Sequence, residues 1–376
     1  MKKLTTLAFA FLLLLGSCVY PYDIQMDDEV DLIPVVDGRI VAGDKATLSI
    51  NWVLPLNVRP NKAKIRNVPY TWWVIDSNGK TYHPTESLPN QVPMTSASGD
   101  LQYKMHLEML DAVYESEWMG SVAPPIVDSI SIWADEKKVN SKATLRLPDS
   151  ATGYIAISTE ETWEFHADLM AEWYIDTEDW SLNEVHDPSV INYYCWISSN
   201  SKEELIMDLS RFDRSGAATI PFNAYSRSDS RNHKRYTVLF IVRSLTEEEY
   251  RYRSNMKTNK EAGNDIFTPN PGQMLGNVRC ISDESLPIMG YVSVSRSNSC
   301  RKWMDDRFYI PTFWSDDFFT FVEEEEYENY YTNWEYRPVR TIVQENVVKG
   351  VGWAPARCVD CVLAGGTKEK PSLWEE

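Results

Sequence analysis

The sequence predicts a mainly β protein built from two sandwich-like domains, with one prominent helix in the second domain. Short segments alternate between apolar and polar residues, which is the period of a strand with one buried face. These segments are rich in β-branched and aromatic residues and are separated by Gly, Asn, Asp and Pro. The chain also holds 14 Trp and 20 Tyr, a content that fully disordered chains lack.

The first 17 residues have the features of a lipoprotein signal peptide. Lys2 and Lys3 precede an apolar run over residues 4–15, shorter than the roughly 20 residues of a membrane-spanning helix. Residues 15–18 read Leu-Gly-Ser-Cys, which matches a lipobox. We expect Cys18 to carry acyl chains, because two or three such chains anchor a protein durably to a bilayer. An ordinary secretory signal with an incidental cysteine is the alternative.

Removing those 17 residues from the 376 leaves about 359, enough for two domains and a third small element. Residues 18–31 lack a clear period and are interpreted as a tether. Residues 32–124 are predicted to form an N-terminal β-sandwich domain of the immunoglobulin/fibronectin-like type. Its expected strands include residues 32–41, 46–54 and 70–79. The Asn78-Gly79 pair at the end of the third segment suits a turn with positive φ.

Pro124-Pro125 interrupts the alternation and is taken as the start of a C-terminal β-rich domain over residues 125–376. The strands expected in this domain include residues 126–133, 153–158, 162–167, 191–197 and 235–243. Each of these segments again combines alternation with β-branched or aromatic side chains. His166 lies in one of them and is expected to be a packed strand residue rather than a catalyst.

One helix is predicted near residues 247–262. Thr246 and Glu249 form a capping box, in which the hydroxyl caps an amide three residues on and the carboxylate reaches back. Leu245 and Tyr250 flank the box at the spacing of a hydrophobic staple. Gly263 supplies the left-handed residue that ends many helices.

Composition and motifs argue against several function classes. The formal net charge of −18, from 55 acidic and 37 basic residues, would repel a phosphate backbone, so we expect no nucleic-acid partner. The chain lacks the H-E-x-x-H, G-x-S-x-G and Gly-rich nucleotide-loop motifs, so we predict no enzyme and no cofactor. A carboxylate pair of the glycosidase kind stays open. Asp305-Asp306 and Asp316-Asp317 could bind Ca²⁺, but such doublets arise by chance in so acidic a chain, and no metal is predicted.

Five cysteines remain once Cys18 is acylated: Cys195, Cys280, Cys300, Cys358 and Cys361. A zinc site would need four ligands, and a thioredoxin-like C-x-x-C would need a βαβ context; neither is visible around the terminal cysteine pair. Structural disulfides are favoured in an oxidising compartment. Cys195 with Cys280, and Cys300 with Cys358 or Cys361, are plausible pairs, although an odd number cannot all pair within one chain.

The C-terminal segment, residues 357–374, reads RCVDCVLAGGTKEKPSLW and is predicted to dock on the second domain. Gly365-Gly366 has no phosphate-loop context and is interpreted as a tight turn. Because chain ends tend to fray, a bulky aromatic at Trp374 indicates an anchor that is buried. The segment is therefore expected to end the chain as a docked tail.

Aromatic residues give the clearest indication of a binding surface. Adjacent strand residues face opposite sides, so one of Trp72 and Trp73 is expected to point outward. Trp314, Tyr330 and Trp334 lie among acidic and amide side chains. Sugars stack on such rings and hydrogen-bond to carboxylates, and peptides use similar surfaces. These five residues are the candidate contacts, and the alternative for each of them is core packing.

Several blocks of the chain together resemble one known family. They are residues 245–252, 257–263, 265–271, 276–280 and 287–295, followed by Cys358-Val-Asp-Cys361, residues 365–367 and residues 370–374. With the lipobox and Tyr194-Cys-Trp196, this order resembles the Bacteroidota lipoproteins of domain-of-unknown-function family 4249. The resemblance implies an outer-membrane lipoprotein associated with TonB-dependent uptake, and it supplies no catalytic residues.

These observations lead to one expected function. The chain is predicted to be a non-catalytic lipoprotein of the outer membrane, anchored by its acyl chains at the cell surface. Its expected partners are the lipid bilayer, a TonB-dependent transporter, and a glycan or peptide ligand that it captures or relays. The alternatives are a hydrolase that acts on an exported polymer through a carboxylate pair, and an adhesin or envelope-scaffold component.

Overall fold

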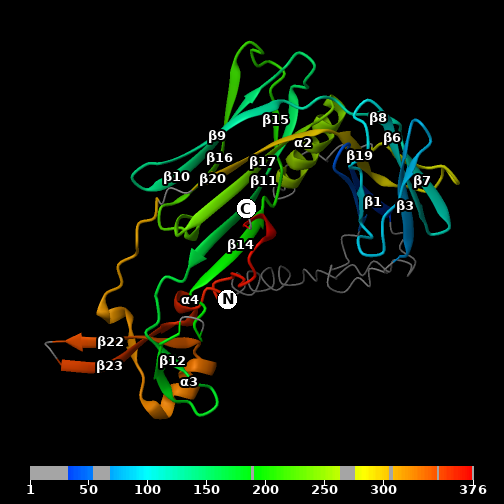
Figure 1. The fold of residues 1–376 in the computed structure, drawn as a ribbon. Coiled ribbons are helices and arrows are strands. Elements are labelled where there is room, and N and C mark those ends of the chain that lie inside the picture. The colour runs from blue at the N-terminus through cyan, green and yellow to red at the C-terminus, as the bar shows by residue number, and fades with distance from the viewer. Residues whose placement is uncertain are drawn as a thin grey trace, which may run out of the picture.

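The computed structural model describes residues 33–53, 68–187, 190–262, 276–304, 308–344 and 347–374 (Figure 1). The fold is mainly β, with several sheets and few helices, as predicted. The signal peptide, Cys18, the tether, Gly263 and Asp305-Asp306 lie outside the described residues. Within the ranges above, no helix combines the length and apolarity that crossing a membrane requires.

The first body is a β-sandwich whose two sheets enclose one apolar core. One sheet has the order β19-β1-β2-β5, and the other has the order β18-β7-β6-β3-β4 with β8 on β6. The strands are β1 (Ile33–Val41), β2 (Lys45–Val53), β3 (Tyr70–Asp76), β4 (Thr81–Tyr82), β5 (Gln91–Pro93), β6 (Gln102–Met109), β7 (Ala112–Ser116), β8 (Met119–Gly120), β18 (Val278–Cys280) and β19 (Met289–Ser295). Inward residues alternate with outward ones along β3 and β6, as the sequence pattern indicates.

Two strands of this sandwich come from far along the chain. β19 pairs with β1 in parallel, and β18 pairs with β7. Residues 278–295, assigned by sequence to the 125–376 domain, therefore complete the first sandwich instead. Gly290 allows the close pairing, because it has a φ of 116° and a Cβ there would lie 1.9 Å from the Val36 carbonyl oxygen. Local periodicity does not reveal a partner more than two hundred residues away.

The second body is another sandwich. Its sheets are β16-β10-β9 and β14-β11-β17-β20, with β15 added to β11. The strands are β9 (Ile126–Ala134), β10 (Lys138–Arg146), β11 (Tyr154–His166), β14 (Tyr194–Asn200), β15 (Leu205–Asp208), β16 (Ala217–Ser226), β17 (Arg235–Ser244) and β20 (Ser297–Met304). The two segments predicted separately at 153–158 and 162–167 form one long strand, β11. Side chains from both sheets share a core that includes Leu145, Ile155 and Phe240.

Helix α2 (Glu247–Ala262) lies where the sequence predicted it and packs near β11, β15 and β19. Thr246 caps it, because its Oγ1 accepts a hydrogen bond of 3.1 Å from the Glu249 amide. The other half of the predicted capping box is wrong. The Glu249 side chain is 1% exposed and accepts hydrogen bonds from Arg243 and Arg253 instead of reaching back to the cap.

A third, small lobe lies at the far end of the second sandwich from the first (Figure 1). It contains β12 (Trp173–Ile175), β13 (Leu182–Glu184), β21 (Thr320–Phe321), β22 (Tyr336–Gln344), β23 (Val347–Pro355), α3 (Tyr327–Thr332) and α4 (Ala356–Val359). Short 3-10 turns also occur at η2 (Ser230–Asn232), η3 (Asp316–Phe318), η4 (Glu324–Glu326) and η5 (Ser372–Trp374), of which η3 and η4 belong to this lobe. Its core gathers side chains from two distant segments, including Ala171, Phe319 and Val339.

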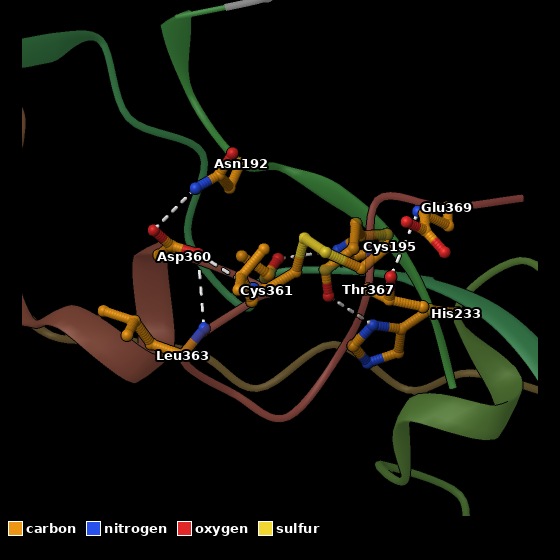
Figure 2. Close-up of a disulfide and its surroundings, with 11 residues drawn as sticks. Asn192, Cys195, His233, Asp360, Cys361, Leu363, Thr367 and Glu369 are labelled. Atoms are coloured by element: carbon orange, nitrogen blue, oxygen red, sulfur yellow. Dashed lines mark hydrogen bonds between the residues drawn. A yellow bond between two sulfur atoms is a disulfide. The ribbon is translucent and has the colours of Figure 1, made fainter. Parts of the chain in front are cut away.

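The C-terminal tail is fastened to the second sandwich. Cys361 forms a disulfide with Cys195 of β14, as Figure 2 shows. Thr367 exchanges two backbone hydrogen bonds with Trp196, at 2.8 and 2.9 Å. Trp374 is 5% exposed, as its predicted anchoring role requires.

A structural disulfide was expected, but the suggested pairs are wrong. Cys280 lies on β18 in the core of the first sandwich, on a different body from Cys195. Cys300 lies on β20, and among the described cysteines Cys280, Cys300 and Cys358 are free thiols. The strand β18 and the C-terminal tail both pack against segments that are distant in sequence. The spacing of the cysteines along the chain therefore could not identify Cys361 as the partner of Cys195.

Candidate functional site

The two adjacent tryptophans of β3 have opposite environments. Trp72 is 2% exposed and its Nε1 donates a hydrogen bond of 2.9 Å to the Pro89 carbonyl, so it belongs to the core. Trp73 faces the other side of the sheet, where its ring stacks on His106 at 4.0 Å between centroids. The predicted alternation is confirmed, and Trp72 is not available as a ligand contact.

The other three aromatic candidates all lie on the small lobe. Trp314 is half-buried and packs on Phe318, with centroids 4.2 Å apart. Trp334 is 64% exposed, and its ring lies nearly parallel to that of Tyr330, with centroids 6.1 Å apart and 23° between the planes. Phe313, which the sequence argument did not single out, is 90% exposed. The motif Phe313-Trp314 could have indicated it, because the residue beside a packed aromatic often faces outward.

We call the rings of Phe313, Tyr330 and Trp334 on the small lobe the aromatic face; Phe313 and Trp334 are exposed, and Tyr330 is half-buried. The same lobe presents exposed carboxylates from Asp316, Asp317, Glu335 and residues 323–326. Arg340 pairs with Asp316 at 2.9 Å and so offsets part of this charge. The face therefore combines flat apolar rings with hydrogen-bond acceptors, which is the chemistry that binds sugars and polar peptides.

A small cavity of about 120 Å³ opens on the same lobe. Its lining includes Trp173, Tyr174, Tyr331 and Arg337. The Arg337 guanidinium lies 3.5 Å from the centroid of the Tyr331 ring, and burial lowers the pKa of Arg337. It also donates hydrogen bonds to the carbonyls of Tyr331 and Tyr336. These contacts fix Arg337 as a structural cation, and the cavity has room only for a small group.

His166 belongs to a packed aromatic cluster beside the disulfide. Its ring stacks on His233 at 4.3 Å and on Tyr193 at 5.2 Å between centroids. Burial lowers the pKa of His233 to about 4, with a smaller contribution from the charge of the neighbouring His166. His233 is therefore neutral near pH 7, as expected for packing. In the described part of the chain, no group of three or more His, Cys, Asp or Glu side chains is arranged to hold a metal ion.

A cluster of ion pairs that the sequence argument missed joins the two sandwiches. Glu204 is held between two guanidinium groups, with bonds of 3.1 and 3.0 Å from Arg39 of β1 and 3.3 and 3.0 Å from Arg243 of β17. Burial alone would raise the pKa of Glu204, but Arg243 and Arg39 together outweigh it and hold that pKa below its usual range. Arg39 and Glu204 are 165 residues apart, so no local motif marks the pair.

The model described as "Domain of unknown function (DUF4249)" matches residues 19–301, well over half of the chain. The chain belongs to this family. The match includes both sandwiches up to β20 and ends before the aromatic face and the docked tail. The terminal blocks that contributed to the sequence resemblance thus lie beyond the matched residues.

Other comparisons add no argument about function. No curated protein matches the chain. Among solved structures, a trypsin-activated alpha-2-macroglobulin from Escherichia coli is 10% identical, with a TM-score of 0.15 over 58% of this chain. The chain covers only 15% of the length of that structure. The Fcho1 Mu homology domain from Danio rerio, solved with a bound Eps15 peptide, is 11% identical, with a TM-score of 0.18 over 71% of this chain and 93% of that one.

Proposed function

We propose that this chain is a non-catalytic lipoprotein of the outer membrane of a Bacteroidota bacterium. Acyl chains on Cys18 hold it at the cell surface, where it works with a TonB-dependent transporter. Its role is to capture or relay a ligand of the glycan or peptide type. The lipobox at residues 15–18 and membership of the family support the anchoring and the partner class.

The observation that carries the proposal is the aromatic face. Burying large rings is favourable, so a 90% exposed Phe313 and a 64% exposed Trp334 on one small lobe indicate a surface that is covered in use. Aromatic residues are also the usual centres of binding energy at interfaces. The face lies on the lobe at the far end of the second sandwich from the first (Figure 1).

The chemistry of the face suits a polyhydroxylated or peptidic surface. The nearly parallel rings of Tyr330 and Trp334 offer flat apolar area. Exposed carboxylates beside them accept hydrogen bonds from hydroxyl or amide groups. Aromatic rings that stack on a ligand and carboxylates that accept its hydrogen bonds can hold the ligand without a reactive group. This combination favours binding rather than catalysis.

Anchoring is tested by Cys18→Ser. The variant should lack acyl chains and leave the membrane fraction, because no helix among the described residues could span a membrane in place of the acyl anchor. Cell fractionation with mass measurement of the N-terminus gives the readout. A variant that stays in the membrane fraction like the unchanged protein would show that acylation is not the anchor.

Partner binding is tested by the double variant Phe313→Ala and Trp334→Ala. Pull-down from detergent-solubilised outer membranes, read by mass spectrometry, should recover a TonB-dependent transporter with the unchanged protein and much less of it with the variant. The matched control is Trp118→Ala with Ile281→Ala, an exposed aromatic and an exposed aliphatic residue on the first sandwich. Equal recovery with both double variants would contradict the role of the aromatic face.

A further inference from the structure

A pocket of about 490 Å³ lies where the two sandwiches meet helix α2. Its lining comes from β1, β11, β15, the segment leading into β15, and α2: Arg39, Ser158, Ser201, Lys202, Glu203, Glu204, Ile206, Arg253, Met256 and Lys257. Pockets that bind small molecules commonly measure about 300–1,000 Å³, so this one is large enough for a ligand. Helix α2, β1 and β15, which contribute to its lining, lie at the opposite end of the second sandwich from the small lobe (Figure 1).

The charge of the pocket contrasts with that of the protein. The whole chain has a formal charge of −18, yet four of the pocket's ten lining side chains are cationic and two are acidic. Lys202 and Lys257 are exposed at its rim. Because cations outnumber carboxylates in its lining, this pocket can attract an anion to an otherwise acidic surface.

Glu204, one of the two acidic residues of the lining, is already engaged. Both oxygens of Glu204 accept hydrogen bonds from Arg39 and from Arg243 behind it, so this carboxylate does not compete for the rim lysines. Arg253 donates its Nε hydrogen to Glu249 at 2.7 Å, and one terminal nitrogen lies 3.9 Å from Asp37. The arginines are thereby held in fixed positions along the pocket wall.

The ion cluster and the rim together carry one surplus positive charge. The cations are Arg39, Lys202, Arg243, Arg253 and Lys257, and the carboxylates are Asp37, Glu203, Glu204 and Glu249. Burial and then the nearby charge of Arg243 lower the pKa of Arg39. One singly charged anion would neutralise the group, whereas a doubly charged phosphate would exceed it.

The uncharged side chains of the lining indicate which other chemical groups the ligand contains. Ile206 and Met256 supply apolar area, and Ser158 and Ser201 supply hydroxyl groups. Methionine adapts its shape readily, which suits a site for a flexible carbon skeleton. A ligand with one anionic group, an apolar part and hydrogen-bonding groups fits this combination.

We propose that this pocket binds a ligand through a carboxylate group, which Lys202, Lys257 and Arg253 receive. The inference deepens the proposed capture function, on which its biological meaning rests, by naming the charged group of the ligand. Two sources present the same chemistry: the carboxylate of an acidic sugar and the C-terminal carboxylate of a short peptide. The site is separate from the aromatic face, so a ligand and a protein partner can be held together.

Isothermal titration of the full-length protein in detergent tests this. The probes are galacturonate and its methyl ester, and an N-acetylated hydrophobic tripeptide and its C-terminal amide. One of the acids should bind and its neutral form should not, which also identifies the source. The double variant Lys202→Ala and Lys257→Ala should weaken binding about tenfold or more, since each removes a charge at the rim. Lys45→Ala with Lys137→Ala makes the same charge change at exposed sites elsewhere and should leave binding intact.

Several results would overturn the proposal. They are no binding of either acid, equal binding of an acid and its neutral form, equal loss in both lysine variants, or inorganic phosphate binding as tightly as the better acid. Each is independent of transporter recovery in the pull-down. If the protein recovers the transporter but binds neither acid, the proposed function stands and the carboxylate site is rejected. If it binds an acid but recovers no transporter, the carboxylate site stands and the transporter partnership is rejected.

Discussion

At the scale of single residues, Trp374 shows how a chain end is held in place. Its ring meets the edge of Trp303 at 4.9 Å, and the Arg235 guanidinium lies 4.1 Å from the Trp303 ring and 5.7 Å from the Trp374 ring. Rings and cation thus form one packed unit on β17, β20 and the tail. The contact area of the indole, more than any hydrogen bond, keeps the tail from fraying.

Trp374→Ala should therefore destabilise the fold. Removing a buried aromatic side chain costs about 3–5 kcal/mol, and thermal unfolding would report this as a clear fall in Tm. Transporter recovery at low temperature should be largely unchanged, because the tail is not the proposed contact. Trp334→Ala is the control and should alter stability little, since its ring is mostly exposed. Full stability together with loss of the partner would instead make the tail the binding element.

The sequence was informative about residues whose environment follows from their neighbours. The alternation that buries Trp72 and turns Trp73 outward, and the burial of Trp374, were predicted in this way. Phe313 and Glu204 were missed because their roles depend on what packs beside them. Phe313 is exposed on the small lobe, and Glu204 meets Arg39 only across the junction between the two sandwiches, 165 residues away in sequence.

At the scale of elements, the cap of α2 can be tested directly. Thr246→Ala removes the hydrogen bond to the Glu249 amide and should cost about 0.5–2 kcal/mol of stability. Thr258 is a matched control within the same helix, because its hydroxyl only bonds back to the Ser254 carbonyl. Urea unfolding of the two threonine-to-alanine variants gives the comparison. A loss no larger at Thr246 than at Thr258 would show that the cap contributes nothing specific.

The disulfide is the second element that lends itself to a test. Cys195 and Cys361 are 166 residues apart, and removing a native disulfide typically costs about 2–5 kcal/mol. The double variant Cys195→Ser and Cys361→Ser should thus unfold at lower urea concentration and expose the tail to proteases. Cys300→Ser, which alters a free thiol on β20, should behave like the unchanged protein. Equal protease resistance in both variants would mean that Trp374 and the Thr367 bridge suffice to hold the tail.

The positions of helices and strands that have a recognisable local sequence pattern were predicted. Which strands pair with one another was not predicted. Thr246 and the acidic first turn marked α2, and alternation marked most long strands. The parallel pairing of β1 with β19 has no local signal, since it joins Val35 to Met289. The small lobe was equally hidden, because its core unites Ala171 with residues after Phe318. The capping-box interpretation of Glu249 failed because a buried partner, Arg243, competed for its carboxylate.

At the scale of the whole molecule, the second sandwich connects two regions with different chemistry. The Glu204 cluster and β19 join it to the first sandwich at one end, and the tail and the small lobe occupy the other (Figure 1). Stability of the junction depends on charge, because two arginines are held there by one carboxylate. The junction is therefore expected to respond to acid in a way that the apolar cores are not.

The sign of that response follows from the pKa of Glu204. Arg243 and Arg39 outweigh burial and keep this pKa below the ordinary value of 4.5, so the folded state binds the proton less readily than the unfolded state. Its contribution to stability is present above pH 4.5 and is lost as the pH falls from there through the folded pKa. Protonation would leave Arg39 and Arg243 side by side without their shared counter-ion.

Glu204→Gln removes this titration and keeps the shape of the side chain. We expect the variant to be less stable near pH 7 by up to about 3 kcal/mol, because an uncompensated buried charge is costly. Its unfolding free energy should also fall less steeply than that of the unchanged protein below pH 4.5. Glu117→Gln breaks an exposed pair with Arg279 and should change stability by less than about 1 kcal/mol, with an unaltered acid response. Urea unfolding at a series of pH values measures all three proteins. Parallel acid profiles for Glu204→Gln and the unchanged protein would show that the junction does not depend on this carboxylate.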